Sequence, residues 1–138
     1  MKKIILLAIA FAGSYIAAAQ RRVPNEVEQS YRRDHPGNDK RNWNYSNNQW
    51  HTRYNDRDNG NRQTDVYYDK QGNRMWSQSR WDRREVPDAV KNSIRRRYHG
   101  NNYQVYRVEK PGTDAYFHVS WGNVHLYLDE QGRDVRNH

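Results

Sequence analysis

Apolar side chains recur at a spacing of four in two short stretches of an otherwise polar chain. The first stretch contains Val23, Val27 and Tyr31, and the second contains Val86, Val90 and Ile94. This spacing places the three side chains of each stretch along one side of an α-helix. Pro24 and Pro87 stand where each helix begins, a position that tolerates proline because no backbone N–H is needed there. The pattern predicts one helix at the start of each half of the chain.

After each helix, apolar and polar residues alternate, which is typical of strands with one buried face. The predicted strands are residues 41–46, 49–55, 64–69 and 73–81 in the first half, and 103–109, 115–121, 124–129 and 133–137 in the second. Gly122-Asn123 and Gln71-Gly72 are typical hairpin turns. The residues assigned to the buried face are Trp50, Thr52, Tyr54, Val66, Tyr68, Phe117, Val119, Trp121, Val124, Leu126 and Leu128.

The two halves also repeat each other in sequence. Residues 23–37 and 86–100 share Val-Pro, a second Val, a Ser, two Arg and a closing Gly, and residues 67–72 correspond to 127–132. A long fixed period indicates a duplicated unit. We therefore predict an α+β fold of two tandem repeats, residues 23–85 and 86–138, each one helix followed by a four-stranded antiparallel meander. Both helices should pack on one face of the sheet and share one core, because half the chain is too small to bury a core alone.

The first residues have the composition of an export signal. Lys2 and Lys3 precede an apolar run from Ile4 to Ala12, and small residues at 17–19 form a cleavage site. Residues 1–19 are therefore expected to be a signal peptide, and residues 20–138 to be the mature single domain. The run is short for a membrane anchor, and the chain has no cysteine for a disulfide or lipid. These features predict a bacterial periplasmic or secreted protein.

Basic residues outnumber acidic ones, 24 to 16, and only two of the bases lie in the leader. The excess favours an anionic partner, although acids are interspersed with the bases and a solvated mixed surface is the alternative. The arginine clusters 32–33 and 95–97 end the predicted helices, where they compensate the helix dipole.

The alternation places an unusual set of side chains on the sheet face opposite the helices. They are His51, Arg53, Tyr67, Tyr116, His118, His125 and Tyr127. Tyrosine and arginine are favoured at protein interfaces, and aromatic rings also stack on sugars and bases. The alternative is a solvated face on which aromatic residues merely reflect strand preference. We take these seven residues as the candidate partner-binding face.

Other patterns argue for neither metal chemistry nor catalysis. His118 and His125 should be diagonal neighbours, but no third ligand accompanies them. The loop from Asp56 to Gly60 lacks the spacing and the closing glutamate of a calcium loop. There is no nucleophile motif and no phosphate-binding glycine loop, and Asp69 and Asp129 occupy turn positions. We expect a non-enzymatic protein without cofactor or metal.

Several of these motifs resemble the PepSY-like family of periplasmic proteins, which is similar in fold to beta-lactamase inhibitor protein. The matching segments are Val23-Pro24, Tyr68-Asp69-Lys70-Gln71-Gly72, Val86-Pro87, Tyr116-Phe117-His118-Val119 and Leu128-Asp129-Glu130-Gln131-Gly132. The resemblance implies helices packed against one antiparallel sheet, and a role in binding or inhibiting another exported protein. The expected partner is thus a periplasmic or surface protein. The alternative is an anionic polymer, such as surface polysaccharide or extracellular DNA.

Overall fold

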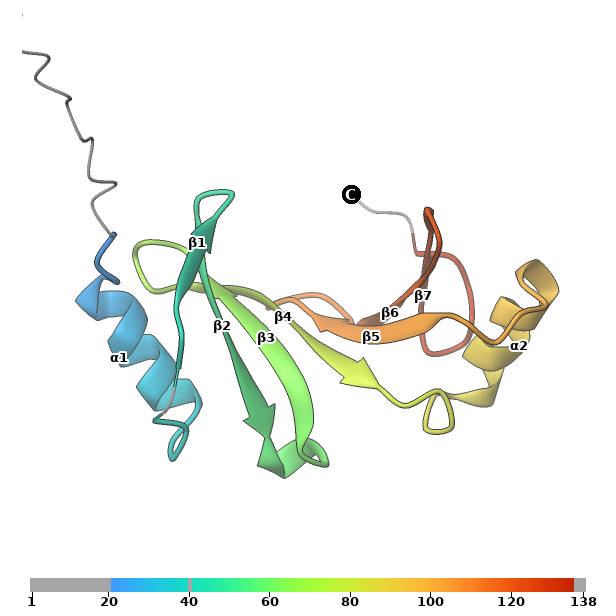
Figure 1. The fold of residues 1–138 in the computed structure, drawn as a ribbon, viewed down its shortest axis with the longest axis horizontal. Helices are drawn as coiled ribbons and strands as arrows, with labels where there is room; N and C mark the ends of the chain where they lie inside the picture. Colours follow the sequence, from blue (N-terminus) through green and yellow to red (C-terminus); the bar gives the residue numbers. More distant parts are fainter. Residues whose placement is uncertain (1–20, 40, 136–138) are drawn as a thin grey trace, which may run out of the picture.

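A computed structural model describes residues 21–39 and 41–135 of the chain (Figure 1). The predicted signal peptide and the last residues of the strand predicted at 133–137 lie outside this part. The elements are α1 (Asn25–Asp34), β1 (Asn44–Ser46), β2 (Gln49–Asp56), the 3-10 turn η1 (Arg57–Asn59), β3 (Arg62–Tyr68), β4 (Arg74–Trp81), α2 (Asp88–Arg97), β5 (Gln104–Glu109), β6 (Tyr116–Trp121) and β7 (Val124–Leu128).

Both predicted helices are present, and each begins directly after the proline that the sequence marked. Acidic residues occupy the first turn and arginines the last turn of α1 and α2. Each charge therefore lies at the end of the helix dipole that it stabilises. Beyond each helix, the backbone N–H of the next residue still donates to the last turn, from His35 to Tyr31 and from Tyr98 to Ile94, both at 2.8 Å.

All strands in the described part belong to one antiparallel sheet with the order β1-β2-β3-β4-β5-β6-β7. The sheet bends strongly, so that its two end hairpins rise on the same side, while α1 and α2 lie outside the two ends (Figure 1). Side chains from both helices nevertheless contact the same face of the sheet. The strand register shows that this face is continuous, since it places in one row Thr64, Ser79, Arg107, Phe117 and Leu128.

The predicted fold of two repeats, each a helix with a four-stranded meander, is wrong. The structure has one seven-stranded sheet, to which the second half contributes three strands. Residues 133–135 make only a bridge between Leu128 and Asp134 and one backbone bond, from Val135 N–H to Tyr127 O at 2.9 Å. Two bonds of 2.6 and 2.8 Å join the Arg97 guanidinium to Asp134, so this polar segment is held toward α2 instead of continuing along β7.

The prediction of one shared core is also wrong, because the buried residues form two clusters. One lies under α1 and comprises Val27, Tyr31, Trp50, Tyr54, Val66 and Tyr68. The other lies under α2 and comprises Val86, Val90, Ile94, Val105, Phe117, Val119 and Leu128. Between them, β4 and β5 present Ser77, Ser79, Arg107 and Glu109 to the helix side, and these polar groups separate the apolar clusters. Of the residues predicted to be buried, Trp121 and Leu126 are half-buried and Val124 is exposed.

Two glycine turns hold the sheet against the helices. Gly72 and Gly132 have φ of +83° and +76°, and a Cβ atom at either would lie 2.5 or 2.3 Å from a carbonyl oxygen in the first turn of α1 or α2. Only glycine fits such a close approach. The predicted role of Asp69 and Asp129 is confirmed, since each carboxylate accepts two backbone N–H groups of its own turn at 2.9–3.0 Å.

Candidate functional site

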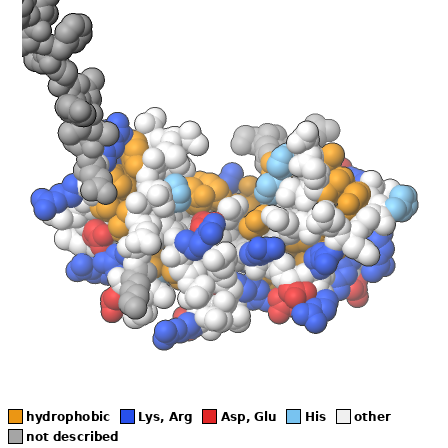
Figure 2. Space-filling model, in the orientation of Figure 1, with side chains coloured by type: hydrophobic (Ala, Val, Ile, Leu, Met, Phe, Trp, Pro, Cys, Tyr) orange, Lys and Arg blue, Asp and Glu red, His pale blue; other side chains and the backbone are white. Residues whose placement is uncertain are grey.

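The sheet face that the helices leave uncovered is concave. We call it the helix-free face. Its side chains form three rows across the strands: His51, Tyr67 and Trp76; Arg53, Asp65, Gln78, Val108 and Tyr116; and Arg80, Tyr106, His118 and Tyr127. His125 lies beyond the third row, on β7. The bend of the sheet turns this face inward. Hydrophobic and histidine side chains gather in the saddle between the two raised ends (Figure 2).

One half of the helix-free face carries a stack of three rings, which we call the first ring stack. The rings of His51 and Tyr67 lie 5.0 Å apart, and those of Tyr67 and Trp76 lie 3.8 Å apart and are tilted by only 7°. The Trp76 indole N–H also donates to Gln49 Oε1 at 3.2 Å. Burial within this stack raises the pKa of the Tyr67 hydroxyl, so the ring is a neutral donor at physiological pH.

The other half carries a second ring stack, formed by Tyr106, His118, His125, Tyr127 and Tyr116. His118 lies flat on Tyr127, with centroids 4.8 Å apart, and its Nε2 is 2.9 Å from His125 Nδ1. Such a bond requires one imidazole to donate and the other to accept. Burial, and then the neighbouring His125, lower the pKa of His118. The His118 ring is therefore neutral at pH 7.

An ion pair lies next to the first ring stack. The Arg53 guanidinium donates to both carboxylate oxygens of Asp65, at 2.7 and 3.1 Å, across β2 and β3. The hydrogen bond to Asp65 is the main reason why the pKa of Arg53 is raised. Because Arg53 is paired with Asp65, the positive charge that the sequence predicted for this face is largely neutralised.

The seven residues proposed from the sequence all lie on the helix-free face, but in two groups. His51, Arg53 and Tyr67 belong to the first half, and the other four are members of the second ring stack. Whether they bind a partner stays a prediction.

Sequence reasoning missed Trp76, Tyr106 and Val108. A bulge beside Tyr67 and Tyr68 shifts the register of β4, so residues 74–81 do not alternate cleanly. The hairpin turn at Gln71-Gly72 shows that β4 returns along β3, but counting from it places Met75 opposite Tyr67, and only the bulge puts Trp76 there. Val108, only 4% exposed, lies between Gln78 and Tyr116 and fills the centre of the helix-free face.

The described part of the chain, residues 21–39 and 41–135, has neither a cluster of metal ligands nor a helix that could span a membrane. No three His, Cys, Asp or Glu side chains in these ranges converge as metal ligands would, and His118 and His125 remain a pair. Neither helix in the same ranges has both the length and the apolar character needed to cross a bilayer.

Solved structures are similar in fold to this chain over most of its length. A BLIP-like protein from Bacteroides fragilis aligns over 85% of this chain and 86% of its own, with a TM-score of 0.66 and 18% identity. The fold is BLIP-like. This outcome confirms the fold that the sequence resemblance implied, whereas the PepSY-like name itself is not confirmed.

Two further solved structures have higher TM-scores against this chain. A DUF2874 family protein from Bacteroides uniformis has a TM-score of 0.72 at 21% identity, covering 83% of this chain and 88% of that one. A candidate periplasmic protein from Bacteroides eggerthii has a TM-score of 0.74 at 16% identity, covering 84% and 88%. Neither the models of known families nor the curated proteins include a match to this sequence. At such identities the likeness establishes the fold alone.

Proposed function

We propose that this protein is a non-enzymatic exported protein that binds another envelope protein through the helix-free face. The observation that carries the proposal is the pair of ring stacks on one concave surface, with buried Val108 between them. Large aromatic side chains with polar tips, around an apolar centre, are the composition of protein interfaces. The BLIP-like fold and the candidate periplasmic neighbour support the same proposal, as do the residues typical of a signal peptide.

The geometry of the rings favours a protein over a stacking ligand. Sugars and bases bind aromatic residues by lying on an open ring face. Here Tyr67 lies against Trp76 at 3.8 Å and His118 lies against Tyr127 at 4.8 Å, so these ring faces contact each other. The inner ring faces are therefore closed to a stacking ligand, whereas the hydroxyls, imidazole nitrogens and ring edges suit hydrogen bonds to polypeptide.

A second candidate function, binding of an anionic polymer, is favoured by a different surface. Arg32, Arg33, Arg95 and Arg96 are exposed at the ends of the two helices. Polymer binding there should weaken steeply with salt. A heparin column loaded at low salt separates the two functions, since variants of the helix-free face should leave such retention unchanged.

The experiment is capture of envelope proteins by residues 20–138, followed by mass spectrometry of the retained proteins. The test variant replaces Tyr67, Tyr116 and Tyr127 with alanine, and the control replaces Arg95 and Arg96. We expect the test variant to lose a protein that the control retains, because tyrosine is enriched among interface hot spots, whose truncation costs about 2 kcal/mol or more. Circular dichroism must show that both variants are folded. Equal retention by the test variant and the unmodified protein would refute the proposal.

A further inference from the structure

Strand β2 is longer than the strand that covers its outer edge. The edge strand β1 pairs only with Gln49, Trp50 and His51, whereas β2 continues to Asp56 and pairs with β3 throughout. Residues 52–56 of β2 therefore have a strand on one side only. Proteins usually cover or interrupt such an edge, because its free backbone groups can pair with another chain.

The register shows which backbone groups face the open side. Ser46 and Gln49 close a hairpin around Asn47 and Asn48, whose φ angles of 49° and 60° fit a two-residue turn. In an antiparallel pair, alternate residues direct both N–H and C=O to the same neighbour. Counting from Gln49, Arg53 and Asn55 direct theirs outward, and neither has a backbone hydrogen bond to the described residues on that side.

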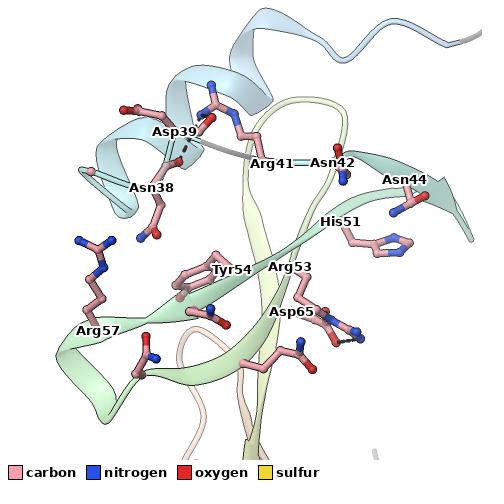
Figure 3. Close-up of a pocket in the computed structure, with 14 residues that line it drawn as sticks. Asn38, Asp39, Arg41, Asn42, Asn44, His51, Arg53, Tyr54, Arg57 and Asp65 are labelled. Carbon is pink, nitrogen blue, oxygen red and sulfur yellow. Dashed lines mark hydrogen bonds and ion pairs between the residues drawn. The ribbon is translucent and has the colours of Figure 1, made fainter.

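A hollow lies beside this edge, between β2 and the chain that leads from α1 into β1 (Figure 3). That chain is held away from β2 by two contacts. The Arg41 guanidinium donates to Glu28 on α1, with Nε–Oε2 at 2.9 Å, and Asn42 O accepts the Thr52 hydroxyl at 3.0 Å. Because Thr52 is buried on the helix side, the latter bond draws the chain off the edge.

The charged side chains that line the hollow indicate which kind of peptide segment would bind there. Arg57, from η1, extends toward Asn38 across the hollow (Figure 3), and no ion pair is found for it in the described part. Among the described residues that line the hollow, the carboxylates are Asp39 and Asp65, and Arg53 holds the latter; Asp56 and Asp58, which flank Arg57 in sequence, line a separate pocket. A carboxylate on an incoming strand would therefore gain a cation at the Arg57 end.

A second copy of this chain fits the edge less well. Two β2 strands paired around a two-fold axis through Asn55 would place Arg53 of one copy opposite Arg57 of the other. An axis through Tyr54 would place His51 opposite Arg57, so neither pairing gives Arg57 a carboxylate. Like charges directly opposite each other destabilise strand pairs. The favourable occupant is therefore a different, acidic chain.

We propose that an extended acidic segment of a partner protein adds to the sheet along residues 53–57 of β2. Backbone bonds to Arg53 and Asn55 would provide affinity, and a carboxylate near Arg57 would provide selectivity, as in other cases of strand addition. This site does not depend on the ring stacks, so it can be tested independently of the proposed binding at the helix-free face.

The test selects displayed random peptides of about eight residues, a length that spans the open edge at about 3.3 Å per residue. The selected peptides should be rich in Asp and Glu. In hydrogen exchange they should protect the amides of Arg53 and Asn55. The variant Asn55→Pro, which removes an outward N–H and suits an edge strand, should weaken binding about tenfold, whereas Asn55→Ala should not. Arg57→Glu should shift the selection to basic peptides.

Three results would overturn the proposal. They are recovery of no peptide, protection elsewhere in the sheet, or equal binding by Asn55→Pro and Asn55→Ala. Should Asn55→Pro fail to fold, methylation of alternate backbone nitrogens in the selected peptide replaces it. A peptide that binds equally well in both methylation registers does not add as a strand.

Discussion

Replacing Gly72 with alanine tests whether contact between a turn and α1 holds the β3–β4 hairpin in place. This hairpin carries Tyr67 and Trp76, so its position determines half of the helix-free face. Gly72 has φ of +83°, and a Cβ atom there would lie 2.5 Å from the Glu26 carbonyl oxygen and 2.9 Å from the Ser30 hydroxyl oxygen. Gly37 provides a matched control, because its φ is +82° and a Cβ atom there would meet nothing within 4 Å.

The two substitutions share one cost and differ in another. A left-handed backbone costs a residue other than glycine about 1–2 kcal/mol, and both positions bear this cost. Only Gly72→Ala also forces its hairpin away from a backbone carbonyl, and overpacking of this kind costs about 1–3 kcal/mol. We therefore expect a loss of about 2–5 kcal/mol for Gly72→Ala and about 1–2 kcal/mol for Gly37→Ala.

Urea unfolding followed by tryptophan fluorescence measures both free energies of unfolding. The informative quantity is the difference between the two variants, because the backbone cost cancels. In addition, Gly72→Ala should change the near-ultraviolet signal of the Tyr67–Trp76 stack, which the control should preserve. If the two variants lose equal stability, the contact between the Gly72 turn and α1 does not hold the hairpin in place.

Other predictions concern single side chains. Because the pKa of His118 lies below 6.5 in the folded protein, the unfolded chain takes up the proton first, so stability should fall as pH drops below about 6.5. His118→Gln should reduce this dependence in urea titrations at several pH values; a slope equal to that of the unmodified protein would contradict the assignment. The Tyr31 hydroxyl is buried, with no hydrogen bond among the described residues, whereas the Tyr68 hydroxyl donates to Asp34 at 3.1 Å. Tyr31→Phe should leave the free energy of unfolding unchanged or higher, and Tyr68→Phe should lower it by about 1–3 kcal/mol; the reverse order would show that these contacts are misassigned.

Much of the candidate face could be predicted because strand alternation is a local property. His118, His125 and Tyr127 follow a simple pattern around a two-residue turn, and the structure places them together. Trp76 was missed because a bulge shifts the pairing of β4, and a bulge depends on two strands at once. The open edge at Arg53 and Asn55 could not be predicted either. The chain before β1 leaves β2 through contacts with Glu28 and Thr52, which no local pattern reveals.

Taken alone, the sequence determined where helices begin, where hairpins turn and which side chains share a strand face. These features depend on backbone geometry and on neighbours a few residues away. Only the tertiary structure decided that the second half has three strands, that the core is divided, and that the sheet is concave. Each of these depends on side chains distant in sequence: Arg97 holding Asp134, polar residues of β4 and β5 separating two apolar clusters, and glycines docking on helix carbonyls. Competition among such long-range contacts is settled only when the whole chain is folded.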